Sequence, residues 1–411
     1  MKNIRIFIPL LILYLFLTIL FSNNFLFGDE FSYVQYATNL SKGYYADKNL
    51  TILFGPGYPL ILSLFIILKA PLIIPKLLNC IFLIGGVIYL FNIISFYITK
   101  KSAIIISYVI GIFPVIIINL LRLMSESLAF FLVSGFIYTL IKYYNIETKN
   151  WRYLILASVF LSYLALTRTI FSYVILVSLI VLILFYFFKK YILVKKTIFV
   201  LIFSIIFCSP YLIYTYSITG KIFYWSTNAG DSIYWLSTTY ESELGDWYSA
   251  PDVYNTGIIN EGHRIFYQKI DSLDAVQKEE LFRAKAIKNI YTHPIKFIKN
   301  WTANIGRLFF NYPFTYDIFN NSYDRQKTTT YFYMFPNMFL IVFLIISFYP
   351  AIISRKIISQ QILIISLLGF IYLAGSTFAS AFVRYFVEAI PFVVLWLVYI
   401  YSQIVKIEIK R

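Results

Sequence analysis

Long runs of apolar residues, separated by short polar or basic breaks, fill most of this chain. A helix of roughly twenty apolar residues crosses a hydrocarbon core about 30 Å thick, so each long run predicts a membrane-spanning helix. The predicted spans are 4–21, 72–98, 102–120, 127–144, 153–167, 170–188, 197–216, 333–353, 360–380 and 386–404. We therefore expect an all-α integral membrane protein with about ten transmembrane helices.

Two segments depart from this pattern. The apolar run at 58–68 is too short to cross a bilayer unaided, so we expect an interfacial helix in the first external loop. The hydrophilic, aromatic-rich stretch 217–332 predicts one large external segment, with a helix inside it at about 272–289. The chain then divides into three parts. These are a membrane module at 1–216 that carries the acidic first loop, the external segment, and C-terminal transmembrane helices at 333–411.

The composition agrees with a membrane protein, because 60% of the residues are hydrophobic and only 13% are charged, whereas soluble domains carry about 25% charged residues. The formal net charge of +16 comes largely from Lys and Arg clusters between the apolar runs. Such clusters stay in the cytoplasm and set the orientation, so no nucleic-acid partner is expected. The main clusters are Lys100-Lys101, Lys189-Lys190, Lys195-Lys196 and Arg355-Lys356.

The start of the chain fixes the direction of threading. Lys2 and Arg5 precede the first apolar run, as in a signal peptide, but no small-residue cleavage pattern follows that run. An uncleaved first span with a cytoplasmic N-terminus is therefore predicted. The frequent Ile, Lys, Asn and Tyr residues indicate an AT-rich bacterial genome, so we expect a multi-pass protein of the bacterial cytoplasmic membrane.

With this threading, isolated acids and arginines all reach the outer ends of the spans. They are Asp29 and Glu30 in the first external loop, Arg122 and Glu126 before the fourth span, Arg168 between two spans, and Arg384 at the start of the last. A single arginine at a helix end can simply reach the lipid headgroups, and a single acid can cap a helix. Carboxylates and guanidinium groups together fit a site that binds phosphate and activates a nucleophile.

Metal and disulfide chemistry have little support in the sequence. Cys80 and Cys208 both lie in apolar runs, and His263 and His293 are too far from acidic partners in the sequence to form a ligand motif. We expect no confidently assigned cofactor and no metal ligand set, and a divalent metal ion stays an open alternative.

At this point the chain resembles the GT-C superfamily of polyprenyl-phosphate-sugar-dependent glycosyltransferases, above all the branch of protein O-mannosyltransferases (family 39) and lipid A aminoarabinose transferases. The resemblance depends on the order and spacing of six short segments. They are Asp29-Glu30 followed by Tyr33 and Tyr36, Gly57-Tyr58-Pro59-Leu60, Ser125-Glu126-Ser127-Leu128, Leu166-Thr167-Arg168, Ala284 to Phe297 with His293-Pro294, and Arg384-Tyr385 followed by Pro391. The prolines usual in three of these motifs are replaced or missing here, but no charged group is changed.

The resemblance implies roles for individual residues. Asp29 would be the principal catalytic carboxylate, supported by Glu30, while Glu126 would help to shape the substrate pocket. Arg168 and Arg384 would contact the lipid phosphate. The remaining implied substrate-binding residues are Tyr33, Tyr58, Tyr385 and Lys69, with Lys42 as another candidate phosphate ligand.

The resemblance also implies a reaction. A sugar would pass from a polyprenyl-phosphate donor to an external glycan, lipid or protein acceptor, with inversion at the anomeric carbon. Two alternatives remain open. An O-antigen polymerase or ligase would use a histidine and arginine in a large external loop, such as His263-Arg264, and a lipid or sugar transporter would place charges at the membrane midplane.

Overall fold

The computed structural model describes residues 4–22, 25–145, 151–255, 259–311, 327–353, 358–379 and 381–409. Within these ranges the ordered elements are all helices. The predicted basic pair Arg355-Lys356 and residues 312–326 of the hydrophilic segment lie outside them.

The first half of the chain forms ten α-helices. They are α1 (Ile8–Phe21), α2 (Asp29–Ser41), α3 (Gly57–Ile67), α4 (Ile73–Ile94), α5 (Lys100–Gly111), α6 (Pro114–Leu120), α7 (Glu126–Asn145), α8 (Trp151–Thr167), α9 (Ile170–Phe188) and α10 (Ile192–Thr219). The hydrophilic segment contributes α11 (Ala229–Leu236), α12 (Ala250–Asn255), α13 (Glu261–Ile270), α14 (Ala275–Thr292) and α15 (Pro294–Phe310). The chain ends with α16 (Lys327–Ile353), α17 (Gln360–Thr377), the 3-10 turn η3 (Val383–Tyr385) and α18 (Phe386–Ile409).

The described helices make this a multi-pass membrane fold. Seven of them are long and apolar enough to cross a bilayer, and the bent pair α5–α6 would make eight. The prediction of about ten spans also counts the shorter apolar helices α1 and α8, so the exact number stays a prediction. The eleven-residue α3 corresponds to the short run that was expected not to cross alone.

One predicted span is wrong in detail. The run 102–120 is two helices, α5 and α6, with a bend of 54° between them. Pro114 begins α6, and Phe113 before it is extended. Proline lacks an N–H group and disfavours helical backbone at the preceding residue, which explains the break.

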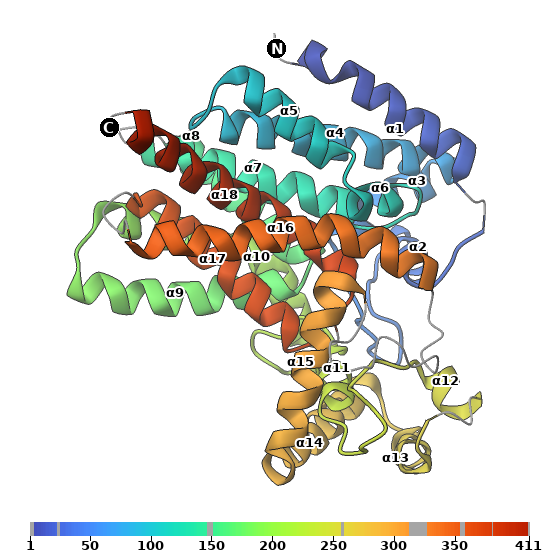
Figure 1. The fold of residues 1–411 in the computed structure, drawn as a ribbon. Helices are drawn as coiled ribbons and strands as arrows, with labels where there is room; N and C mark the ends of the chain where they lie inside the picture. Colours follow the sequence, from blue (N-terminus) through green and yellow to red (C-terminus); the bar gives the residue numbers. More distant parts are fainter. Residues whose placement is uncertain are drawn as a thin grey trace.

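The centre of the membrane part is built around α7 and α18. Protein atoms bury 78% of the membrane-length window of α7 and 89% of the window that covers η3 and α18. Figure 1 shows α1, α4, α5, α7, α16 and α18 running in similar directions, with both termini toward one side and α11–α14 on the other. Helices enclosed in this way can carry carboxylates, because neighbouring helices supply the partners that lipid cannot.

The hydrophilic segment packs around a small aromatic core of its own, formed by Tyr234, Trp235, Tyr267 and Phe282 together with smaller residues. It is joined to the first loop by backbone hydrogen bonds, from Thr227 N to Ile52 O at 2.7 Å and from Ala275 N to Asn49 O at 3.0 Å. The start of α14 is fixed by a capping box at Asp274, and α15 runs across the direction of the long apolar helices (Figure 1).

Candidate active site

The acidic first loop delivers Asp29 to the start of α2. Gly28 precedes it with φ of +56°, a backbone conformation that costs glycine little. The Asp29 side chain is 30% exposed, and its Oδ2 lies 2.5 Å from Nη2 of Arg384. The first-loop carboxylate and the late-span arginine, 355 positions apart in the chain, therefore form one ion pair.

Glu30 lies beside Asp29 but faces the protein. One carboxylate oxygen accepts a hydrogen bond from the Phe27 N–H at 3.1 Å, and the other accepts one from the Leu123 N–H at 2.7 Å. Because both oxygens are bound to backbone amides and the residue is only 1% exposed, Glu30 ties the first loop to the segment before α7. Its contacts are those of a positioning residue.

Glu126 begins α7 and lies between the two arginines. Its Oε1 is 3.6 Å from Arg168 Nη1 and 3.7 Å from Arg384 Nε. Within the described residues, neither carboxylate oxygen of Glu126 has a hydrogen-bond partner, although the side chain is 1% exposed. A buried carboxylate without hydrogen bonds is costly, and the two guanidinium groups offset that cost, while Glu126 itself lines neither of the two cavities described below.

The sequence analysis missed a fourth carboxylate, Glu388. It is fully buried near the start of α18, and its Oε1 lies 2.7 Å from Arg168 Nε. The Tyr372 hydroxyl donates to its Oε2 at 3.2 Å. A lone acid in an apolar span, four residues after Arg384, was the signal that could have found it.

Tyr385 and Tyr33 complete the surroundings of the arginines. The guanidinium carbons of Arg168 and Arg384 lie 4.7 and 5.5 Å from the centre of the Tyr385 ring, where the ring face attracts cations. The Tyr33 hydroxyl lies 3.0 Å from the Ser125 hydroxyl, which also accepts a 3.4 Å hydrogen bond from Arg168. The structure thus brings Asp29, Glu126, Arg168, Arg384, Tyr385 and Tyr33 to one place.

Three predicted residues do not belong to this group. Tyr58 is buried against the ring of Tyr33, and its hydroxyl hydrogen bonds with Asn79. Tyr58 therefore helps to hold Tyr33 in position. Lys69 and Lys42 are exposed at the ends of α3 and α2, and neither lines the two cavities described below.

The Gly55-Pro56-Gly57 turn explains how Arg168 is placed. A Cβ atom at Gly55 would lie 2.1 Å from the Leu166 carbonyl oxygen, and one at Gly57 would lie 2.4 Å from the Thr167 hydroxyl oxygen. The turn before α3 therefore packs directly on the backbone at the end of α8, one residue before Arg168. Only glycine allows so close a contact.

Two cavities meet at Arg384, which lines both. The smaller, about 370 Å³, is mainly apolar, and its lining includes Arg168, Tyr385, Tyr33, Ile170, Tyr372 and Phe378. The larger, about 760 Å³, has polar and apolar lining, including Asp29, Glu30, Lys76, Arg122, Asp246, Trp247 and Arg307. Asp29 thus faces the larger cavity, whereas Arg168 faces the smaller.

The hydrophilic segment supplies one wall of the larger cavity, which the sequence did not predict. Lys296 and Arg307 of α15 donate hydrogen bonds to the backbone carbonyls of residues 243–245. These bonds hold Asp246 and Trp247 at the cavity. Burial lowers the pKa of Lys296, because the charged form is poorly solvated there.

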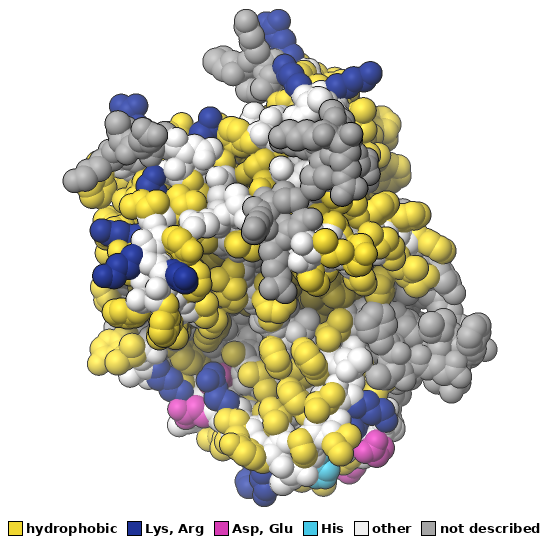
Figure 2. Space-filling model, turned by 60° about the vertical axis from the view of Figure 1, so that its left-hand side comes forward, with side chains coloured by type: hydrophobic (Ala, Val, Ile, Leu, Met, Phe, Trp, Pro, Cys, Tyr) yellow, Lys and Arg dark blue, Asp and Glu magenta, His cyan; other side chains and the backbone are white. Residues whose placement is uncertain are grey.

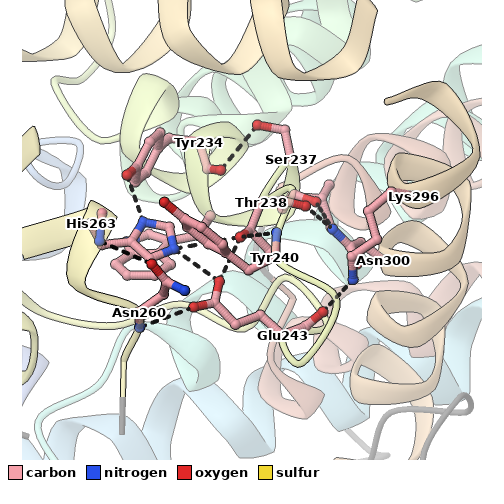
Figure 3. Close-up of polar contacts among 12 residues, drawn as sticks. Tyr234, Ser237, Thr238, Tyr240, Glu243, Asn260, His263, Lys296 and Asn300 are labelled. Atoms are coloured by element: carbon pink, nitrogen blue, oxygen red, sulfur yellow. Dashed lines mark hydrogen bonds and ion pairs between the residues drawn. The ribbon is translucent and has the colours of Figure 1, made fainter. Parts of the chain in front are cut away.

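The same loop is held from its other side by His263 (Figure 3). The His263 Nδ1 lies 2.6 Å from the Tyr234 hydroxyl, and its Nε2 lies 2.9 Å from Glu243 Oε2, which also accepts a hydrogen bond from Thr238. Burial alone would raise the pKa of Glu243, but these hydrogen bonds lower it below its usual value. His263 is 2% exposed and lines neither cavity.

In the part of the chain that the structure describes, no group of three or more His, Cys, Asp or Glu side chains could hold a metal ion. Asp29 and Glu126 both approach Arg384.

Comparisons with known proteins identify the fold. No protein-family model matches the chain, and no curated protein matches it. A solved structure of the archaeal oligosaccharyltransferase AglB from Archaeoglobus fulgidus, in complex with an inhibitory peptide and a dolichol-phosphate, superposes with a TM-score of 0.51 at 13% identity. The match covers 96% of this chain and 50% of the archaeal chain. The protein therefore has the GT-C membrane fold.

Proposed function

We propose that this protein is a membrane glycosyltransferase that moves one sugar from a polyprenyl-phosphate donor to an acceptor on the outer face of the cytoplasmic membrane. The observation that carries the proposal is the convergence of Asp29, Glu126, Arg168 and Arg384, from four distant parts of the chain, where two cavities meet. Carboxylates and arginines are the groups that this transfer needs.

The smaller cavity fits the donor. Its apolar lining suits a prenyl chain, and Arg168 and Arg384 in the same lining suit the phosphate, since guanidinium groups bind phosphate oxygens with paired hydrogen bonds. Tyr385 would pack beside the lipid between the two cations. The archaeal neighbour was solved with a dolichol-phosphate, and a lipid phosphate in this cavity would be its counterpart here.

The larger cavity fits the acceptor, because Asp29 and polar side chains line it. Asp29 would take the proton from an acceptor hydroxyl as its oxygen bonds to the anomeric carbon of the sugar. The bond from that carbon to the phosphate oxygen breaks, and the prenyl phosphate leaves with the electron pair while the arginines neutralise it. Such a single displacement inverts the anomeric centre. The acceptor is an external glycolipid, glycan or protein.

Two rival functions receive less support from the same structure. A polymerase or ligase that uses His263 and Arg264 needs these side chains at a cavity, but His263 is buried in the loop network and Arg264 pairs with Glu261. A transporter needs charges along a path through the membrane, whereas the charged groups described here gather at one end of the helices.

The test compares cells that express the natural chain, an Asp29→Asn variant or no protein, by mass spectrometry of their surface glycolipids, glycans and glycoproteins. We expect one sugar mass to appear only with the natural chain. Arg264→Gln is the matched control, which should behave as the natural chain does. Full transfer by a membrane-inserted Asp29→Asn variant would remove Asp29 from the mechanism, and a loss confined to Arg264→Gln would favour the polymerase or ligase.

A further inference from the structure

The helix α15 buries three polar side chains and exposes two isoleucines, with the half-exposed Lys299 next to them. Lys296, Asn300 and Arg307 point into the protein, with relative exposures of 5%, 0% and 5%. By contrast, Ile295 and Ile298 are 82% and 57% exposed. In water this arrangement would be unfavourable, because a helix normally turns its apolar side inward. Something apolar is therefore expected to cover the outer side of α15.

The exposed apolar side continues onto a membrane helix. Trp301 of α15 stacks on Phe378 with ring centres 5.3 Å apart, and its indole N–H donates to Thr377 at the end of α17 at 3.0 Å. Phe378 is 49% exposed, and Phe370 on α17 is 68% exposed. The outer surface of α15 is thus continuous with apolar surface on a helix that is long enough to cross the bilayer.

The end of α14 extends the same patch and adds a basic margin. Ile287 and Tyr291 are 49% and 84% exposed, and Lys285 and Lys288 are exposed beside them. Figure 2 shows hydrophobic side chains gathered on the lower part of the molecule, the height at which Figure 1 places α14 and α15, with both basic and acidic side chains at their edges. Apolar residues bordered by lysines are typical of helices that lie on an anionic lipid surface.

We propose that the end of α14 and the outer side of α15 rest on the outer leaflet of the bilayer. Ile295, Ile298 and Tyr291 enter the acyl boundary, and Lys285 and Lys288 contact anionic lipid headgroups. The bilayer fits better than a protein partner, because the patch continues from α17 and α15 runs across the membrane-spanning helices (Figure 1). This inference rests on the membrane fold and not on the transferase activity. It gives the hydrophilic segment a contact with lipid. This contact would also affect the larger cavity, because α15 hydrogen bonds to the 243–245 loop beside it.

The test places a nitroxide spin label at Ile295→Cys or Ile298→Cys in the full-length protein, reconstituted into nanodiscs of phosphatidylcholine with or without phosphatidylglycerol. The natural Cys80 and Cys208 are buried, so the introduced cysteine is labelled selectively. Collision of the label with oxygen and with a water-soluble nickel chelate reports immersion in lipid. Ile265→Cys on α13, 60% exposed, is the matched control for a water-facing position.

We expect labels at positions 295 and 298 to favour oxygen over the nickel chelate several-fold more than the label at position 265. We also expect deeper immersion with phosphatidylglycerol, and the loss of this difference when Lys285→Gln and Lys288→Gln are combined, whereas Lys269→Gln on α13 leaves it. Equal nickel access at all three positions would overturn the lipid contact. Spin–spin broadening between labels would assign the patch to a second copy of the chain instead, and immersion independent of phosphatidylglycerol would overturn the role of the two lysines.

Discussion

At the scale of single residues, the site depends on how its two guanidinium groups are held. Arg384 lies between Asp29 and Glu126, and Arg168 lies between Glu126 and Glu388. Glu126 thus lies within ion-pair distance of both arginines. Glu388 is fully buried and, of the two arginines, pairs with Arg168. We expect the position of Arg168 at the smaller cavity to depend on Glu388.

Replacing Glu388 with Gln should weaken that hold. Removing one partner of a buried ion pair costs about 3–5 kcal/mol, and misplacing a positioning group lowers transfer about 100-fold. We expect the variant to melt at a lower temperature and to show a raised donor KM. Glu280→Gln is the control, because Glu280 is 58% exposed and pairs with Lys221 at the surface. Unchanged donor KM in Glu388→Gln would show that Arg168 is held by other groups.

A second prediction concerns Asp231 in the hydrophilic segment. Burial raises its pKa to about 6, against the opposing effect of hydrogen bonds from Trp247 and Tyr267. The fold therefore disfavours the charged form. The contribution of Asp231 to the free energy of unfolding should be fully present below about pH 4 and should be lost as the pH rises toward 6, by at most about 1.4 kcal/mol per pH unit.

Tryptophan-fluorescence melts of the detergent-solubilised protein between pH 4 and 7 would measure this slope. Asp231→Asn should remove it, whereas Asp271→Asn, at a side chain that is 74% exposed, should keep it. Equal slopes in the natural chain and the Asp231→Asn variant would assign the pH dependence to another group.

The sequence predicted the central acids and arginines because each interrupts apolar sequence at the end of a run. Glu388 and Lys76 were missed because each lies inside an apolar run; the sequence shows that a charge is there, but not which distant side chain it contacts. Lys69 was selected for its charge and its place after a short run, but its side chain is exposed and away from the cavities.

At the scale of elements, the contact between the Gly55-Pro56-Gly57 turn and the end of α8 fixes the depth of Arg168. The obstacles around Gly55 are backbone atoms of Leu166, which cannot rotate away. Around Gly86 on α4 the nearest atoms belong to the Phe130 ring, which can adjust. Substitutions at the two glycines therefore distinguish a disturbed site (Gly55) from disturbed packing between helices (Gly86).

We expect Gly55→Ala to lower transfer about 100-fold per folded molecule, because α8 must move away and carry Arg168 with it. Gly86→Ala should cost about 1–3 kcal/mol of stability through overpacking yet retain transfer per folded molecule. Thermal melts and transfer assays on the same preparations would compare them. Normal transfer by Gly55→Ala would mean that α8 tolerates the added methyl group.

The apolar pattern predicted where the helices lie better than it predicted whether each helix is continuous. The Pro114 break inside a predicted single span was readable from proline chemistry, but its angle of 54° depends on packing. The role of α15 could not be read at all, because the sequence does not reveal that its polar side faces the 243–245 loop.

At the scale of the whole molecule, the orientation remains a prediction from the basic clusters. Cysteine labelling in intact cells would test it, because Cys80 and Cys208 are buried. We expect Lys269→Cys on α13 to react with a membrane-impermeant maleimide, and Lys101→Cys at the start of α5 to react only after permeabilisation. The reverse pattern would place the site in the cytoplasm and exclude an external acceptor.

The sharing of Arg384 between the two cavities has a consequence for the order of events. A phosphate that enters the smaller cavity competes with Asp29 for the same cation, so occupancy there changes the environment of the carboxylate in the other. If the phosphate changes the affinity for a second ligand that binds at Asp29, thermodynamic linkage requires that this ligand change the affinity for the phosphate by the same factor. Through Arg384, binding in either cavity therefore changes the affinity for a ligand in the other.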